Sequence, residues 1–298
     1  MAQVSEERER APIPMSSPGP VEPAEPAKKP SRAGRDLPAA IGVGLVLGAA
    51  VLASLLTVRY VFLGIIGIAM AVGTIEFAQA LRRAAGIRLA LIPLLVGGQA
   101  MVWLTWPFGL TGTLVAFALT MLACLLWRLP GGADGYLRDT SATVFAAAYL
   151  PLCGSFAAMM LLPSDGAARV LTFLIGVVAS DTGGYAAGVL KGRHPMAPSI
   201  SPKKSWEGFG GSLVAGIVAG ALTFSFLLDA HAWQGVLFGA AIVLTATLGD
   251  LVESLIKRDL GVKDMGTMLP GHGGLMDRLD SLLPSAVVSW VLLSAFVA

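Results

Sequence analysis

The sequence predicts an all-α protein that crosses a membrane many times, and three observations support this prediction. Only 13% of its 298 residues are charged and 55% are hydrophobic, whereas a soluble domain carries about 25% charged residues. The mean hydropathy is +0.74. The chain after Leu37 is a series of apolar stretches close to the length that a membrane-spanning helix needs, about 20 residues. The two cysteines lack C-x-x-C spacing, which excludes a zinc site or a disulfide framework.

The first segment, residues 1–36, differs from the rest. It is rich in Pro, Glu, Lys, Arg and Ser and contains no apolar stretch, so it does not resemble a secretory signal peptide. A segment of this composition cannot bury enough apolar surface to fold. We expect a disordered cytoplasmic tail at 1–36, followed by one membrane-embedded domain at 37–298.

The apolar stretches predict about nine transmembrane helices. The second stretch includes Glu76, close to Arg82 and Arg83, which predicts an ion pair at the helix end rather than a catalytic group. The nine candidates lie near residues 37–56, 60–80, 88–106, 108–127, 141–162, 168–190, 209–228, 233–256 and 282–298.

The positions of the basic residues predict the orientation. With the N-terminus in the cytoplasm and nine alternating spans, 19 of the 21 Lys and Arg residues fall on the cytoplasmic side, and only Arg59 and Arg169 fall outside. This follows the positive-inside rule and places the C-terminus outside. The outer loops are short, whereas two inner loops, 191–208 and 257–281, are long. We therefore expect an active-site cavity that opens to the cytoplasm.

Small residues at a spacing of four recur within the spans, at Gly44 with Gly48 and at Gly216 with Gly220. Such pairs let two helices approach closely. Packing within one chain is the favoured interpretation, and a dimer interface is the alternative.

The densest group of charges lies between Gly249 and Asp280, where six of the 13 acids outside the tail occur. Asp250, Glu253, Ser254 and Lys257 have spacings that place them on one face of a helix. A carboxylate next to an apolar stretch is costly unless it is paired or binds a metal. An ion pair of Asp250 or Glu253 with Lys257 and a metal site both satisfy this condition.

A Gly-rich loop, Leu269–Gly274, follows this helix and leads into a second one that carries Asp277 and Asp280. Free N–H groups at such a helix start can bind an anion. Aspartates there can simply complement the helix dipole. Together with the acids of the preceding helix, they favour binding of a hard cation such as Mg²⁺, which takes oxygen ligands and often keeps phosphate in its shell.

The other inner loop carries bases and serines, including Lys203, Lys204 and Ser205. They are interpreted either as a positive-inside anchor or as a phosphate clamp. Asp181 lies within the sixth span, where an acid indicates a functional site unless it is hydrogen-bonded structurally. Acids for Mg²⁺ beside a basic, Gly-rich surface favour phosphoryl or nucleotidyl transfer between a cytosolic nucleotide and a lipid.

Three segments resemble the phosphatidate cytidylyltransferase (CDP-diacylglycerol synthase) family. The run from Ser254 through Lys263-Asp264 and Leu269–Asp280 resembles the family signature without a departure. Ser201–Gly208 and Asp181–Tyr185 also resemble family segments, and Gly184 stands where Ala is expected. The resemblance covers residues 37–298 and implies transfer of CMP from CTP to phosphatidate, which gives CDP-diacylglycerol and diphosphate for phospholipid biosynthesis.

The resemblance also implies the site, the cofactor and the partners. Mg²⁺, alone or with a second cation, is the implied cofactor. CTP, phosphatidate, the bilayer and a second copy in a homodimer are the implied partners, with no nucleic acid, and the inner (plasma) membrane is the expected location of this multi-pass chain. The implied catalytic residues are Asp250, Lys257, Asp277 and Asp280, and the three aspartates are the implied metal ligands. The implied substrate-binding residues are Asp181, Ser201, Lys203, Lys204, Ser205, Arg258, His272, Gly273, Gly274 and Arg278.

Two other functions remain open at this stage. A CTP-dependent enzyme that acts on a different lipid phosphate, or a CTP-dependent lipid kinase, would keep the same chemistry. A transporter or channel would use Asp181 and Asp250 as ion sites, but transporters often show paired broken helices in two repeats. No such repeat is visible in the sequence, where the polar loops gather in the C-terminal half.

Overall fold

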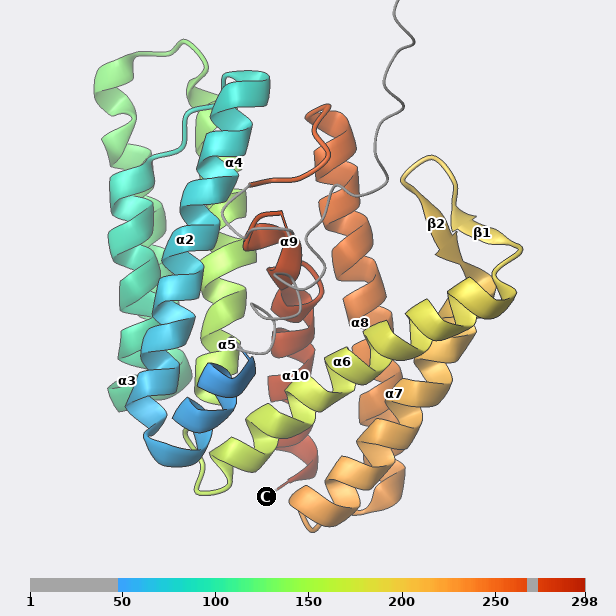
Figure 1. Ribbon diagram of the computed structural model, residues 1–298. Helices are drawn as coiled ribbons and strands as arrows, with labels where there is room; N and C mark the ends of the chain where they lie inside the picture. The colour runs from blue at the N-terminus through green and yellow to red at the C-terminus, as the bar shows by residue number, and fades with distance from the viewer. Residues whose placement is uncertain (1–47, 267–272, 298) are drawn as a thin grey trace, which may run out of the picture. The chain divides into compact units, whose positions relative to one another are not determined.

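The computed structural model describes residues 48–266 and 273–297. The predicted tail, the start of the first predicted span and His272 lie outside these ranges. Helices dominate the described chain (Figure 1). The labelled α-helices are α2 (Arg59–Ala85), α3 (Leu91–Trp127), α4 (Tyr136–Ala147), α5 (Cys153–Met159), α6 (Gly166–Lys191), α7 (Trp206–Leu227), α8 (Ala232–Asp259), α9 (Met276–Leu279) and α10 (Leu282–Phe296).

Seven helical segments of the described chain are long and apolar enough to cross a bilayer. One of them combines α4 and α5, which are joined by a π-helical turn, Ala148–Leu152, that contains Pro151. Another combines α9 with α10. A shorter apolar helix, Gly48–Thr57, precedes α2. These segments confirm a mainly α-helical, multi-pass membrane protein.

Helix α3 reverses direction at its centre. Pro107 lies inside it, and Gly109 has a non-helical backbone with φ 55° and ψ −141°. The hydroxyl of Thr113 donates to the carbonyl of Met101 at 3.3 Å, although a rise of about 1.5 Å per residue would hold these residues about 18 Å apart in a straight helix. The predicted spans 88–106 and 108–127 are therefore the two arms of this helical hairpin.

Helices α6, α7 and α8 pack in close contact through small residues. A Cβ on Gly220 would overlap the backbone of Gly235 in α8, and a Cβ on Gly216 would overlap Val243. On the other side of α7, a Cβ on Gly211 would overlap the Ala187 side chain of α6. The pair Gly216 and Gly220 thus packs within the chain, which confirms the favoured interpretation of its spacing. Gly44 of the other pair lies outside the described residues.

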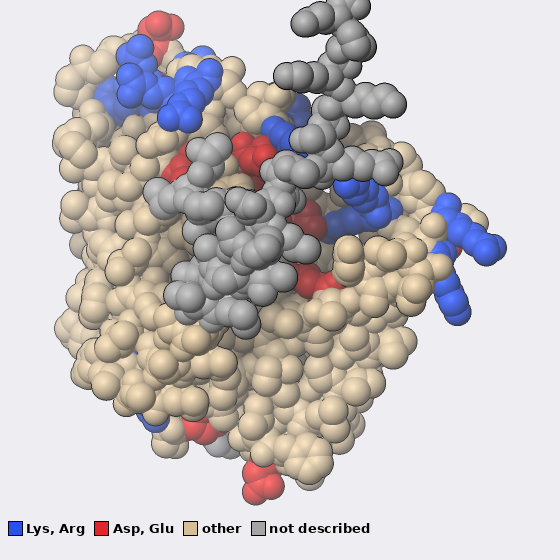
Figure 2. All heavy atoms as spheres, in the orientation of Figure 1, with Lys and Arg blue, Asp and Glu red and all other residues tan. Residues whose placement is uncertain are grey.

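The two bases predicted on the outer side lie at the same end of the helices. Arg59 donates to the carbonyls of Pro163 and Ser164 at 3.0 and 2.6 Å. Arg169 pairs with Asp165 at 2.8 Å. Figure 2 shows many of the other blue side chains near the opposite end.

The prediction of an all-α chain missed one element. The loop after α6 forms an antiparallel hairpin of β1 (Pro195–Ala197) and β2 (Ser201–Ser205). Prolines at 195, 198 and 202 argue against a strand, because proline lacks the N–H that a sheet requires. A hairpin with only two strands tolerates them, because each strand has a free edge. Figure 1 places this hairpin beyond the ends of α6 and α7.

Candidate active site

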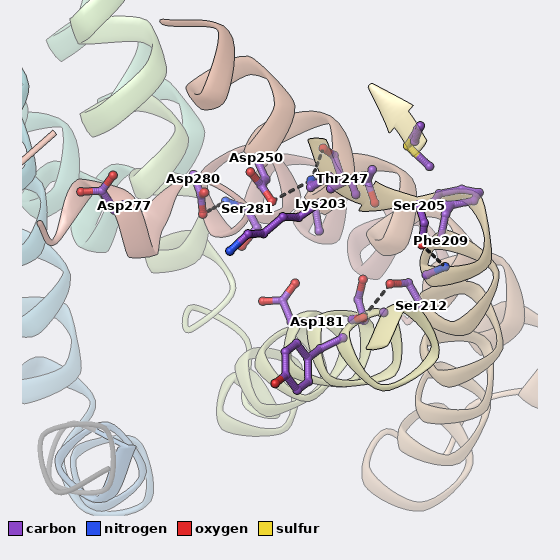
Figure 3. A pocket seen from close by; sticks show the side chains of 18 of the residues that line it. Asp181, Lys203, Ser205, Phe209, Ser212, Thr247, Asp250, Asp277, Asp280 and Ser281 are labelled. Carbon is purple, nitrogen blue, oxygen red and sulfur yellow. Dashed lines mark hydrogen bonds and ion pairs between the residues drawn. The ribbon is translucent and has the colours of Figure 1, made fainter. Parts of the chain in front are cut away.

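A polar cavity of about 370 Å³ lies where α6, α7, α8 and β2 meet the start of the last span. Figure 3 shows Asp250 and Asp280 on one side of the cavity, Asp181 on the opposite side, and Lys203 reaching in from the hairpin. Its lining residues are Ser180, Asp181, Gly184, Tyr185, Gly188, Met196, Lys203, Lys204, Ser205, Gly208, Phe209, Ser212, Ala246, Thr247, Asp250, Asp277, Arg278, Asp280 and Ser281.

The cavity unites most of the site residues that the sequence predicted. Those that line it are Asp181, Lys203, Lys204, Ser205, Asp250, Asp277, Arg278 and Asp280. Ser201, Lys257, Arg258, Gly273 and Gly274 do not line it. His272 lies outside the described residues. Three segments far apart in sequence therefore form one site.

Asp250 and Lys204 form an ion pair across this cavity. The ammonium of Lys204 lies 2.7 Å from Oδ2 of Asp250 and donates to the Thr247 carbonyl at 3.3 Å. The other oxygen of Asp250 accepts from the Ser254 hydroxyl at 3.2 Å. The pair joins β2 to α8 and remains partly exposed, with 24% of the Lys204 side chain and 38% of the Asp250 side chain accessible.

Asp277 lies at the edge of the cavity and holds the loop that precedes it. Its carboxylate accepts from the N–H of Met265 at 3.0 Å and from the N–H of Gly274 at 2.9 Å. The Lys257 ammonium contacts the other oxygen at 3.0 Å. In Figure 3 the Asp277 carboxylate points away from the cavity centre. Its local role is thus to join the signature loop to the end of α8.

Lys257 forms an ion pair with Glu253. This pair is one of the two interpretations that the sequence allowed for the acids on this helix, the other being a metal site. The ammonium lies 2.7 Å from Glu253, whose side chain is fully buried. Glu253 Oε1 has no hydrogen-bond partner among the described residues. Lys257 thus contacts two buried acids, Glu253 and Asp277, and does not itself line the cavity.

Asp181, Asp250 and Asp280 offer carboxylates to the cavity from α6, α8 and the turn between α9 and α10 (Figure 3). Oδ1 of Asp280 accepts from the N–H of Ser281 at 2.7 Å. No three Asp, Glu, His or Cys side chains of the described chain lie close enough together to hold a metal by themselves. Mg²⁺ commonly uses only one or two carboxylates and completes its shell with substrate phosphates and water. The all-oxygen donors here fit that chemistry.

The β-hairpin is fixed at its tip and at its base. The guanidinium of Arg258 donates to the Ile200 carbonyl at 3.2 Å. At the base, Glu207 accepts from the N–H groups of Arg193 and His194 and contacts the His194 ring. Ser205 caps α7 by accepting from the N–H of Gly208 at 3.1 Å. Arg258, predicted to bind substrate, thus contacts the hairpin in this structure.

Glu76 was assigned wrongly from sequence. Among the described residues it forms no ion pair with Arg82 or Arg83. Its side chain turns inward, is only 5% exposed, and accepts from the N–H of Met276 at 3.0 Å. A Cβ on Gly266 would overlap its Oε1. Nearness in sequence suggested an ion pair, but six or seven residues span about two helical turns, so those arginines lie too far along α2, and the Glu76 carboxylate contacts Met276 instead.

The sequence also missed several neutral residues of the cavity. Ser212 donates to the Ser180 carbonyl at 2.7 Å and joins α7 to α6. Tyr185 and Phe209 place aromatic rings on the wall. Such residues are common inside membrane spans, so their type alone does not mark a site. The available signal was spacing: Tyr185 lies four residues after Asp181, and Ser212 lies four residues after Gly208, so each pair shares a helix face.

The fold and cavity define a class: a multi-pass helical membrane protein with a cavity that is lined by both carboxylates and ammonium groups. Comparison with known proteins identifies the family within this class. Residues 38–296 match the model of the cytidylyltransferase family. The chain is 54% identical to the phosphatidate cytidylyltransferase of Mycobacterium bovis, over 91% of this chain and 92% of that one. It is 51% identical to that of Mycobacterium leprae, over 90% of both chains.

The chain therefore belongs to the cytidylyltransferase family, within the phosphatidate cytidylyltransferase group, and is an enzyme of that type. The family match spans the predicted membrane helices and both long polar loops. The expectation drawn from the signature is confirmed.

Proposed function

We propose that this chain transfers the cytidylyl group of CTP to phosphatidate and forms CDP-diacylglycerol and diphosphate. The observation that carries the proposal is the cavity in which Lys203 and Lys204 face Asp250 and Asp280 at the end of membrane-crossing helices. An amphiphilic acceptor can keep its acyl chains in the bilayer while its phosphate enters such a cavity. Relatives named phosphatidate cytidylyltransferase support the substrates.

The chemistry requires a phosphate oxygen of the lipid to attack the α-phosphorus of CTP. The new P–O bond replaces the bond to the β-phosphate, and diphosphate leaves with the electron pair. A phosphate monoester has a second pKa near 6, so its oxygen is already anionic at neutral pH and needs no strong base. The main obstacle is repulsion between two anions. Lys203, Lys204 and Arg278 line the cavity where they can offset it.

Mg²⁺ is the proposed cofactor, and its role when bound is to neutralise negative charge on the phosphates. Asp250 and Asp280 are the ligands best placed to hold it. Asp277 is the third predicted ligand, but its oxygens already accept from Met265, Gly274 and Lys257. Binding a cation would require it to exchange one of these contacts, so its present contribution is to position the loop.

A direct assay tests the reaction. Purified full-length protein in detergent is incubated with labelled CTP, phosphatidate and Mg²⁺, and CDP-lipid and diphosphate are quantified. Parallel reactions contain other lipid phosphates and diacylglycerol. Product from phosphatidate alone supports the proposal. Product only from another acceptor, or no product where a positive control works, contradicts it.

The proposed topology has nine spans, with the N-terminus and the cavity at the cytoplasmic face of the inner (plasma) membrane. Support comes from the reversal within α3, from the further helix Gly48–Thr57, and from the position of Arg59 and Arg169 at the end away from the cavity. A thiol test uses Asp134→Cys and Ser164→Cys, both exposed, after Cys124 and Cys153 are replaced by serine. In intact cells an impermeant maleimide should label the Ser164 variant and spare the Asp134 variant. The reverse pattern contradicts the orientation.

The tail at 1–36 and the homodimer are also proposals. Light scattering in detergent, corrected for the bound detergent, measures the mass of the protein component. A value of about twice the chain mass of 30.7 kDa supports a dimer, and a value equal to it contradicts one. Removal of residues 1–36 should leave turnover intact, because every residue proposed to bind CTP, phosphatidate or Mg²⁺ lies after it in the sequence.

A further inference from the structure

Lys204 and Asp250 form an ion pair in this structure, although the proposed reaction requires Lys204 to bind phosphate and Asp250 to bind a cation. The Lys204 ammonium lies 2.7 Å from Oδ2 of Asp250. Asp250 is a proposed cation ligand, and Lys204 is a proposed phosphate-binding group. Both of these residue roles depend on the enzymatic function proposed above. While the ion pair is formed, Asp250 is not available to a cation and Lys204 is not available to a phosphate.

The geometry indicates that this pair can open. Both side chains are partly exposed, and ion pairs with such exposure contribute little net stability. A divalent cation on Asp250 would also repel the adjacent ammonium. The second oxygen of Asp250 contacts Ser254, so a cation that uses Oδ2 competes directly with Lys204.

We propose that Lys204 is an exchangeable counter-cation: it neutralises Asp250 before a divalent cation binds, and cation binding frees its ammonium for the substrate phosphates. Binding of the cation and binding of the nucleotide are then coupled favourably, and the coupling is reciprocal. The ordered exchange also keeps the Asp250 carboxylate neutralised, so that Asp250 does not repel an incoming triphosphate.

Lys203 provides a matched comparison. It precedes Lys204 on β2, lines the same cavity and carries the same charge (Figure 3). Lys203 forms no ion pair within the part of the chain that the structure describes. A general effect of positive charge in the cavity should be similar for both lysines, whereas competition for Asp250 belongs to Lys204.

The experiment measures cation binding by the purified full chain in detergent without nucleotide, using Mn²⁺ and the EPR signal of the free ion. Lys204→Gln should tighten Mn²⁺ binding about three- to tenfold, because it removes a competing ion pair. Lys203→Gln should change it by no more than about twofold, since exposed charges are screened by salt. Lys204→Arg keeps the charge and should bind Mn²⁺ like the unaltered protein.

A second measurement follows CTP binding by calorimetry, in EDTA and with Mg²⁺. Lys204→Gln should weaken CTP binding about tenfold with Mg²⁺ but at most about twofold in EDTA, where Lys204 is still held by Asp250 in the unaltered protein. Thermal unfolding confirms that each variant is folded before binding is compared.

The outcomes separate this inference from the proposed function. If the unaltered protein binds neither Mn²⁺ nor CTP, the proposed function is wrong. If it binds both, but Lys204→Gln leaves Mn²⁺ affinity unchanged or lowers it, the exchange is wrong and the proposed function stands. Equal tightening by Lys203→Gln would also overturn the exchange, since it would show a general charge effect.

Discussion

The carboxylate of Glu76 in α2 accepts a hydrogen bond from the backbone N–H of Met276 at 3.0 Å, across 200 positions of the chain. Met276 is the first residue of α9, so Glu76 satisfies one of the free N–H groups at the start of that helix. The bond joins the N-terminal helices to the segment that carries Asp277 and Asp280. Gly266 and Gly274 approach the same carboxylate closely.

Replacement of Glu76 by alanine should loosen this loop and lower turnover. The change leaves the Met276 N–H buried without a partner, which costs about 1–3 kcal/mol. Hydrogen exchange of peptides that cover 261–276 should accelerate, and turnover should fall at least tenfold. Glu76→Gln keeps an acceptor oxygen and should retain most of the exchange protection and most of the turnover. Gln79→Ala, an exposed change on the same helix, is the matched control; unchanged exchange in Glu76→Ala would contradict the role of Glu76.

Replacement of Asp277 by alanine should remove nearly all turnover. The variant loses the acceptor for Met265 and Gly274 and leaves Lys257 with one acid. Asp277→Asn keeps the shape but turns an amide N–H₂ toward N–H donors or Lys257, so it should be almost as inactive. Detergent gel filtration checks that the variants are folded. A folded Asp277→Ala variant with a near-normal rate would remove Asp277 from the site.

Replacement of Lys257 by methionine should destabilise the protein strongly. Glu253 is fully buried and Asp277 nearly so, and removing one partner of a buried ion pair costs about 3–5 kcal/mol. Thermal unfolding in detergent should therefore shift to lower temperature. The double change Lys257→Met with Glu253→Gln should recover part of that loss, because one buried charge disappears. No recovery would show that Glu253 and Lys257 do not act as a pair.

Replacement of Asp250 or Asp280 by asparagine should raise the Mg²⁺ concentration needed for half-maximal turnover. Each change removes one unit of negative charge from the cavity and weakens a proposed cation ligand. A shift of at least tenfold is expected for each, because an interaction with a charged group contributes about 1.5–3 kcal/mol and about 1.4 kcal/mol corresponds to a tenfold change in affinity. Asp259→Asn, an exposed change at the end of α8, is the control. An unchanged Mg²⁺ requirement in both variants would exclude them as ligands.

Replacement of Gly220 by alanine should destabilise the α7–α8 contact. Its Cβ would overlap the backbone of Gly235, and overpacking of this kind costs about 1–3 kcal/mol. The same change at Gly210, where a Cβ meets no atom within 4 Å, should be neutral or slightly stabilising, because alanine favours a helix more than glycine does. Unfolding temperatures of the two variants provide the comparison, and equal shifts would argue against close helix packing.

Much of the fold could be predicted from the sequence, because transmembrane helices are specified by local composition. Helices α6, α7 and α8 begin and end within a few residues of the predicted stretches. The reversal of α3 at Pro107 and Gly109 also lies where two spans were predicted to meet. The hairpin β1–β2 was missed, because prolines that disfavour a strand are tolerated at its free edges.

The candidate site was predicted as a set of residues but not as an arrangement. The density of acids between Asp250 and Asp280 and the paired lysines on the other loop marked two segments that meet at the cavity. Pairing depends on how helices pack, and no sequence spacing specifies it. Lys204 therefore contacts Asp250 from another element, Lys257 does not line the cavity, and Glu76 reaches a loop 200 positions away.

By itself, the sequence determined that this protein lies in a membrane, which loops carry most of its charges outside the tail, and to which family it is similar. Those properties follow from local composition and from a contiguous motif. Only the tertiary structure decided which acid faces which base, which carboxylates point into the cavity, and that Asp277 holds a loop. These depend on contacts between distant helices, whose close approach is set by the glycines between α6, α7 and α8.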